Sequence, residues 1–86
     1  MATLLITYDL NSSGQNYEDV HAAIKSLGDC KHPLESTWFV KTTMSPRQVH
    51  DKLNTVTDEG DRWFIGELTS NHWGLLDKAI WEWLRQ

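Results

Sequence analysis

The chain has 86 residues, which suits one small domain and leaves no room for a second core. Its 12 acidic side chains outnumber its 8 basic ones, a balance unlike the basic one expected of an autonomous nucleic-acid-binding protein. The single cysteine, Cys30, excludes an intrachain disulfide or a thiolate metal site. No segment is apolar over the roughly 20 residues that a membrane span needs, so no membrane partner and a cytoplasmic location are expected.

The first predicted element is the segment TLLITYDL, residues 3–10. It is short, almost continuously apolar and rich in β-branched residues, which predicts the central strand of a sheet, buried on both faces. The turn formers NSSGQN follow, and Asn16 is placed to cap a helix that Gly28 would end. The apolar residues of this helix recur at helical spacing: Tyr17, Val20, Ile24 and Leu27.

Residues 30–43 change to a β-rich pattern and predict a hairpin whose second arm contains Trp38 and Val40. Pro33 cannot donate a hydrogen bond to a neighbouring strand, so the first arm is expected at a sheet edge or with a bulge. A turn over residues 33–36 is expected to join the two arms, and the pattern leaves the strand boundaries within residues 30–36 open.

A second helix is expected to begin after Ser45, with Pro46 in the first helical position and Gln48 completing a capping box. Val49, Leu53 and Val56 would form its buried stripe. The polar segment TDEGD then predicts a turn, and RWFIGEL, residues 62–68, predicts a last strand with Gly66 as a bulge or close-approach point.

In residues 71–85, near the end of the sequence, apolar side chains recur at helical spacing, which predicts an appended C-terminal helix. Trp81 falls off its apolar face. An indole in that position is suited to anchor a contact with a second subunit, so Trp81 is a candidate dimer-interface residue.

The predicted succession is strand, helix, hairpin, helix, strand and added helix. This is the order of the split βαβ, or ferredoxin-like, plan. The whole chain, residues 1–86, is therefore expected to form one α+β domain, a ferredoxin-like two-layer sandwich with residues 71–85 appended. A chain this short buries a modest share of its surface on folding, so a homodimer is expected to add stability.

The segments TLLITYDL, STWFV and WFIGEL, taken in this order, resemble the small CRISPR-associated adaptation endonucleases and their VapD-like relatives. The chain is more closely similar to short SinR-like proteins, which are diverged members of that superfamily, over roughly residues 1–70. The resemblance implies a ferredoxin-like protomer that forms a homodimer. It also implies that the acid ending the first strand faces its symmetry mate, binds a divalent metal ion and cleaves phosphodiester bonds in RNA or DNA.

Asp9 is the residue in that position, and the resemblance assigns it as both catalytic and metal-binding. Two carboxylates brought together by a two-fold axis repel, and Mg²⁺ or Mn²⁺ would relieve the repulsion and activate water. The alternative is a structural carboxylate that accepts hydrogen bonds from the next turn. Near Asp9, the candidate substrate-binding residues are Tyr8, Asn11, Ser12 and Ser13.

Two functions remain open at this point. The retained Asp9 favours a metal-dependent endonuclease. Family members often carry arginine or lysine soon after the strand-terminal acid, whereas this chain has no basic residue between Asp9 and Lys25. That difference and the acidic total favour a non-catalytic dimeric module that binds a protein or small ligand in a toxin–antitoxin, phage-defence or counter-defence system.

Overall fold

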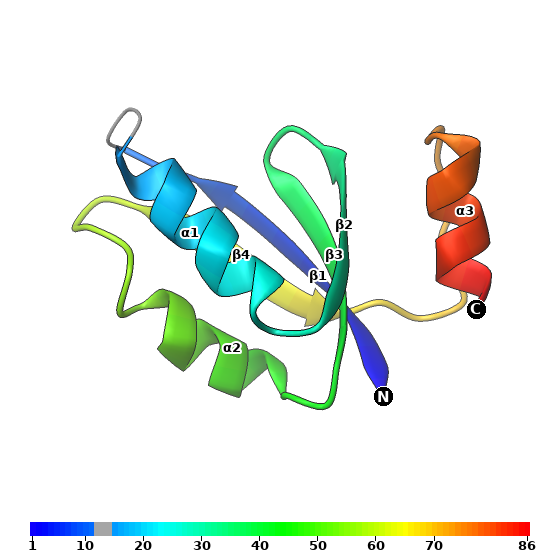
Figure 1. Ribbon diagram of the computed structural model, residues 1–86, viewed down its shortest axis with the longest axis horizontal. Coiled ribbons are helices and arrows are strands. Elements are labelled where there is room, and N and C mark those ends of the chain that lie inside the picture. Colours follow the sequence, from blue (N-terminus) through cyan, green and yellow to red (C-terminus); the bar gives the residue numbers. More distant parts are fainter. Residues whose placement is uncertain (12–14) are drawn as a thin grey trace.

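The computed structural model describes residues 1–11 and 15–86 and contains the elements in the predicted order (Figure 1). The elements are β1 (Ala2–Asp9), α1 (Gln15–Lys25), β2 (Asp29–Leu34), β3 (Thr37–Thr42), α2 (Pro46–Leu53), β4 (Arg62–Glu67) and α3 (Lys78–Arg85). The four strands form one sheet in the order β2-β3-β1-β4, and every neighbouring pair is antiparallel. The protein is thus a small α+β domain.

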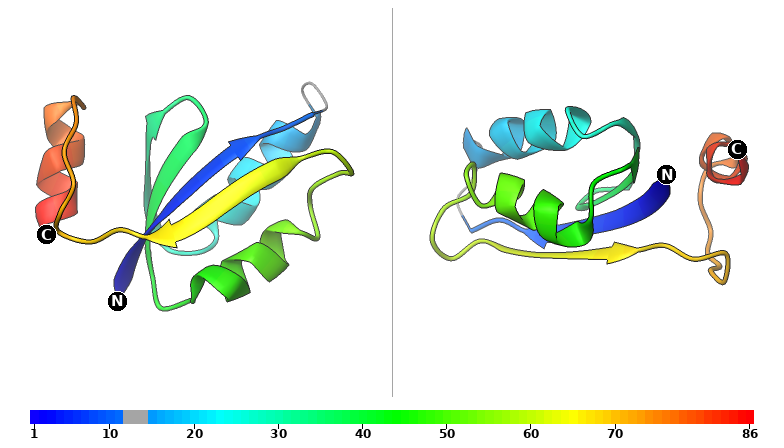
Figure 2. Two further views of the ribbon diagram at one scale, coloured as in Figure 1. Left: turned by 180° about the vertical axis from the view of Figure 1, so that it is seen from behind. Right: turned by 90° about the horizontal axis from the view of Figure 1, so that it is seen from below.

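Strand β1 lies inside the sheet, as predicted, because it pairs with β3 on one side and β4 on the other. Its burial alternates, with Leu4, Ile6 and Tyr8 buried and the residues between them only half-buried. The expectation of burial on both faces is therefore wrong. Helices α1 and α2 lie together on one side of the sheet and cover only that face (Figure 2).

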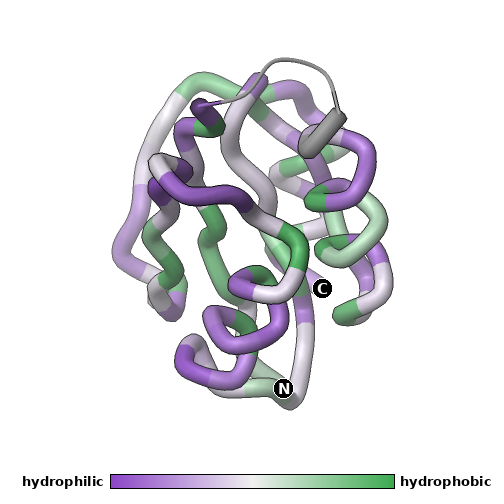
Figure 3. The backbone as a smooth tube through the Cα atoms, turned by 90° about the vertical axis from the view of Figure 1, so that its left-hand side faces the viewer, coloured by the Kyte–Doolittle hydropathy of each residue, from purple (hydrophilic) through white to green (hydrophobic). Residues whose placement is uncertain are grey.

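The core lies between these two helices and the covered face of the sheet. Its members are Leu4, Ile6, Tyr8, Leu10, Val20, Ile24, Leu27, Trp38, Val40, Val49 and Leu53. Figure 3 shows hydrophobic residues recurring along the strands in the middle of the molecule. Removing these side chains from water is the main favourable contribution to folding, at roughly 25 cal/mol per Å² of apolar surface.

The hairpin of β2 and β3 and its irregular first arm agree with the prediction, but the turn covers only residues 35 and 36, because Pro33 and Leu34 belong to β2. Strand β2 is an edge strand, and its register with β3 shifts between Lys31 and Leu34, around Pro33. Helix α1 begins at Gln15, so Asn16 lies within the helix and does not cap it. Gly28 lies just before β2, where a Cβ atom would collide with the backbone carbonyl of Lys41.

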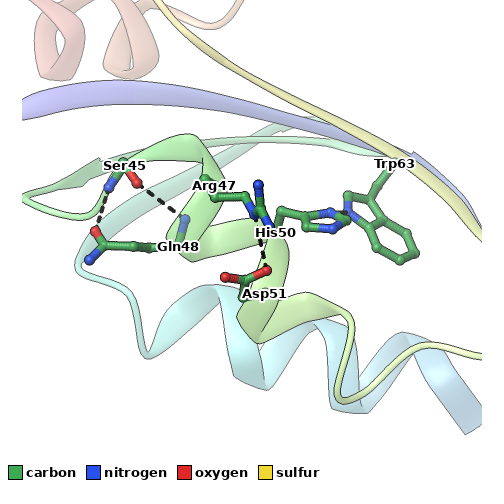
Figure 4. Close-up of polar contacts among 6 residues, drawn as sticks. All are labelled: Ser45, Arg47, Gln48, His50, Asp51 and Trp63. Atoms are coloured by element: carbon green, nitrogen blue, oxygen red, sulfur yellow. Dashed lines mark hydrogen bonds and ion pairs between the residues drawn. The ribbon is translucent and has the colours of Figure 1, made fainter.

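Helix α2 begins as its capping chemistry predicts (Figure 4). The Gln48 amide donates to Ser45 Oγ at 3.2 Å, and the Ser45 amide donates to Gln48 Oε1 at 2.8 Å. Both bonds satisfy amides that the helix itself leaves without partners. Val49 and Leu53 are buried as expected, whereas Val56 lies after the helix ends and is only partly buried.

Strand β4 pairs with β1 in one unbroken register from Leu4 opposite Glu67 to Asp9 opposite Arg62. The bulge expected at Gly66 is therefore absent. Instead, the ring of Phe64 lies against Gly66, where an added Cβ would be 3.4 Å from the ring.

Helix α3 begins at Lys78, later than the predicted start at residue 71. Asn71 and Gly74 are poor helix formers, and the chain from residue 71 to residue 77 has no regular structure. Trp73 consequently lies outside any helix and is 97% exposed. None of the helices in the described ranges is long and apolar enough to cross a membrane.

Trp83 attaches α3 to the hairpin. Its indole Nε1 donates to Asp29 Oδ2 at 2.9 Å, and its carbonyl accepts a hydrogen bond from Lys41 Nζ at 2.6 Å. Lys41 pairs with Thr3 and alternates with the buried Val40, so its side chain is on the face away from α1 and α2. Helix α3 therefore lies on the opposite side of the hairpin from the other helices (Figure 2).

Candidate functional site

The half of the sheet formed by β1 and β4 has a face on which none of the helices in residues 1–11 and 15–86 lies. We call it the open face and define it by Leu5, Thr7, Asp9, Arg62 and Phe64. These residues share one side because paired residues of antiparallel strands point the same way and successive residues alternate. Phe64 is 67% exposed, although phenylalanine side chains are usually buried. The open face is thus apolar at its centre and charged at one end.

Asp9 ends β1 at the charged end of this face, and its side chain is exposed. The register places Arg62 directly opposite it. A depression of about 310 Å³ lies here, between the ends of the two strands, with Thr7 and Phe64 in its lining. The arrangement combines a carboxylate that can bind a cation with a guanidinium that can bind a phosphate.

Asp9 has few other candidate metal ligands near it within the described part of one chain. Within residues 1–11 and 15–86, no group of three or more His, Cys, Asp or Glu side chains could hold one. A hard cation such as Mg²⁺ takes oxygen ligands and usually keeps several waters, so one or two carboxylates can suffice if substrate phosphates contribute. Asp9 therefore fits such an ion chemically only when a second copy or a substrate completes the ligand set.

Tyr8 points to the other side of the sheet from Asp9 and is buried in the core. Its hydroxyl accepts a hydrogen bond from Trp38 Nε1 at 3.2 Å and lies 2.8 Å from His21 Nε2. Burial raises the pKa of Tyr8 above its ordinary value, and the hydrogen bond from Trp38 offsets part of that rise. The ring of Tyr8 thus packs and forms hydrogen bonds in the core, although Tyr8 is also a candidate substrate-binding residue and lines the depression beside Asp9.

A cluster of aromatic rings and imidazoles surrounds Tyr8. His32 stacks on Trp38 with ring centroids 4.1 Å apart, and His21 lies 5.3 Å from both of these rings. Burial lowers the pKa of His21, and the nearby His32 and Lys25 lower it further. The sequence shows no sign of this cluster because its members come from β1, α1, β2 and β3.

The lowered pKa of His21 predicts how stability changes with pH. The folded protein binds a proton at His21 less readily than the unfolded chain does, so the free energy of unfolding should fall as pH drops below about 6.5. The decline should end once pH passes below the folded-state pKa. Urea unfolding of the native protein and of His21→Gln at a series of pH values would measure this dependence of the free energy of unfolding on pH. The variant should show a shallower decline, and identical slopes would contradict the assignment.

The remaining candidates occupy different environments. The backbone amide of Asn11 donates to Asp61 Oδ1 at 2.7 Å, while Ser12 and Ser13 lie outside the described residues. Trp81 is half-buried on α3, near the opposite end of β1 from Asp9. Burial raises the pKa of the Cys30 thiol, which disfavours its reactive thiolate form. Tyr8 therefore belongs to the lining of the depression beside Asp9, although its ring points to the other side of the sheet, whereas Trp81 lies near the opposite end of β1.

Asp61 is a further carboxylate that has a clear structural role. It is 6% exposed, although an acidic turn of this kind is usually solvated. Its Oδ2 accepts from the Asp58 amide at 2.8 Å, and its Oδ1 accepts from the Asn11 amide. Asp61 therefore ties the turn before β4 to the chain that leaves β1, and so helps to hold Asp9 opposite Arg62.

Comparison of the chain with protein-family models and with curated proteins finds no match.

Proposed function

We propose that this protein is a homodimeric, metal-dependent endonuclease of the CRISPR-associated and VapD-like kind, acting on phosphodiester bonds in RNA or DNA. The observation that carries the proposal is the position of Asp9 opposite Arg62 on the open face. Arg62 supplies a basic group beside Asp9, whereas the loop that follows β1 contains no arginine or lysine. The two side chains have the charges needed for a divalent cation and for the phosphate that it would help to cleave.

The proposal includes a ferredoxin-like fold. Support comes from the sheet order β2-β3-β1-β4, the antiparallel pairing throughout, and the placement of α1 and α2 on one face. The face opposite α1 and α2 carries α3 beside the hairpin, which leaves the open face at β1 and β4 available for another function.

Dimerisation through the open face would complete the site. Phe64 is the most exposed large apolar side chain on this face, and covering it with a second copy would remove apolar surface from water. A two-fold axis near the end of β1 would bring two Asp9 carboxylates together. The two carboxylates would hold a divalent metal ion, and that ion would supply charge neutralisation and an activated water for phosphodiester hydrolysis. Arg62 would orient the phosphate through paired hydrogen bonds.

The test is a cleavage assay with single-stranded RNA and double-stranded DNA in the presence of Mg²⁺, Mn²⁺ or EDTA. Cleavage should require the metal and fall by about 100-fold or more in Asp9→Asn, which keeps the side-chain shape and removes the charge. Arg62→Gln should reduce cleavage as well. Glu67→Gln is the matched control, because Glu67 is an exposed acid at the other end of β4.

Cleavage that persists in EDTA would contradict a metal-dependent reaction. Equal cleavage by Asp9→Asn and Glu67→Gln would contradict a catalytic role for the Asp9 carboxylate.

A second candidate function is a non-catalytic dimeric module of a toxin–antitoxin, phage-defence or counter-defence system, which would bind a protein partner. It is favoured by the lack of a three-ligand metal group within the described part of one chain and by the net charge of −4. A protein that is dimeric by light scattering but shows no metal-dependent cleavage of either substrate would support this candidate over the first.

A further inference from the structure

A second concave site lies at the other end of the molecule, between α3 and the segment that leads to it. We call it the tail pocket and define it by Thr3, Ser70, His72, Trp73, Trp81 and Arg85. Its volume is about 460 Å³, which is within the range of small-molecule sites. Thr3 and Asp9 are near the two ends of β1, roughly 20 Å apart at the rise of a β-strand. The tail pocket is therefore separate from the candidate site at Asp9.

Aromatic rings form one side of the tail pocket. The Trp81 ring lies nearly parallel to His72, with centroids 6.0 Å apart, and 6.3 Å from the Trp73 ring. Trp73 is almost fully exposed, so most of its flat surface faces water. Exposed rings held next to one another can stack on a planar heteroaromatic group.

The polar groups of the pocket favour an anion. Among the described residues that line the pocket, Arg85 is the one with a formal charge, and none carries a carboxylate. The side-chain ion pairs found within residues 1–11 and 15–86 are Arg47 with Asp51 and Lys78 with Glu82, so Arg85 takes part in neither. A guanidinium without a carboxylate partner, in a protein of net charge −4, is suited to a phosphate.

We propose that the tail pocket binds a nucleotide, with the base stacked on Trp81 and in edge contact with Trp73, whose ring is tilted by 44° from that of Trp81, and with the phosphate held by Arg85. This inference goes beyond the proposed nuclease function, because it concerns different residues and requires no cleavage. Rings alone would fit many apolar ligands, and a cation alone would fit many anions. Their combination in one pocket selects a planar base that carries a phosphate.

The indole N–H groups provide a direct measurement. Trp38, Trp63 and Trp83 each donate the indole N–H to a protein acceptor. No such bond involves the indoles of Trp73 and Trp81 among the described residues. In ¹H–¹⁵N NMR spectra, titration with adenosine 5′-monophosphate should shift the indole signals of Trp73 and Trp81 to saturation. The other three indole signals should stay in place.

Variants distinguish the contribution of the Arg85 charge to binding from that of the aromatic rings. Arg85→Gln should weaken binding of the monophosphate about tenfold and leave binding of adenosine unchanged. Trp81→Leu should weaken both ligands about tenfold. Arg47→Gln is the matched control for the lost charge, since Arg47 is an exposed arginine on α2, far from α3 (Figure 1). Trp73→Ala, which replaces an exposed ring, gives a second aromatic test that does not depend on the core.

The source of the nucleotide is decided by comparing adenosine 5′-monophosphate with a short single-stranded oligonucleotide that carries a 5′-phosphate. Equal affinities assign the pocket to a free mononucleotide, and tighter binding of the oligonucleotide assigns it to a nucleic-acid end. Three results would overturn the proposal: no saturable shift of Trp73 and Trp81, equal weakening by Arg85→Gln and Arg47→Gln, or shifts of these indoles with protein concentration alone. The last result would mean that a second copy occupies the pocket. Loss of cleavage in Asp9→Asn with nucleotide binding retained would separate the two sites.

Discussion

Replacement of Trp38 by alanine is expected to lower the free energy of unfolding by about 3–5 kcal/mol. Trp38 is 4% exposed in the core, donates its indole proton to Tyr8 and carries the stacked ring of His32. The substitution would leave a large cavity and a tyrosine hydroxyl that has lost a donor. Because small domains have total stabilities of about 5–15 kcal/mol, much of the protein would unfold near physiological temperature.

Urea unfolding followed by circular dichroism would measure this loss. Trp73→Ala is the matched control, since it removes the same ring from a position that is 97% exposed, and it should change stability by less than about 0.5 kcal/mol. Equal effects of the two substitutions would mean that Trp38 is not the centre of a packed cluster.

The second large effect is expected for Asp61→Ala, at about 3 kcal/mol. The carboxylate of Asp61 accepts hydrogen bonds from the amides of Asn11 and Asp58, and its removal would leave both donors without this partner in a site that is largely closed to water. Glu59→Ala changes an exposed acid in the same turn and should have little effect.

Equilibrium unfolding together with amide hydrogen exchange would test the role of Asp61. Protection of the Asn11 and Asp58 amides should decrease in Asp61→Ala and remain in Glu59→Ala. Unchanged protection of both amides in Asp61→Ala would show that the carboxylate does not hold this turn to the end of β1.

Local chemistry explains why several elements could be predicted from the sequence. The capping box of Ser45 and Gln48 acts within one turn, and the position of Pro33 restricts β2 wherever the strand lies. The apolar spacing of residues 71–85 predicts a helix from residue 71, but the low helical propensity of Asn71 and Gly74 delays the start of α3 to Lys78. Likewise, an apolar strand such as β1 can be covered on one face or both, and only the packing of the helices decides which.

The candidate site was partly predictable for the same reason. Asp9 stands out because it follows an apolar strand, and its exposure agrees with a role at the surface. Arg62 could have been found by pairing the end of β1 with the start of β4, as the predicted order of elements allows. The contact of His21 with Tyr8, and the burial of Asp61, depend on side chains from distant segments, and no local pattern in the sequence specifies them.

The central claim is that two copies share one metal ion through Asp9. The most direct measurement is a titration of the protein with Mn²⁺, in which electron paramagnetic resonance reports the free ion. We predict one bound Mn²⁺ for every two chains. This binding should be lost in Asp9→Asn and retained in Glu67→Gln. One ion bound per chain, or binding that survives Asp9→Asn, would contradict it.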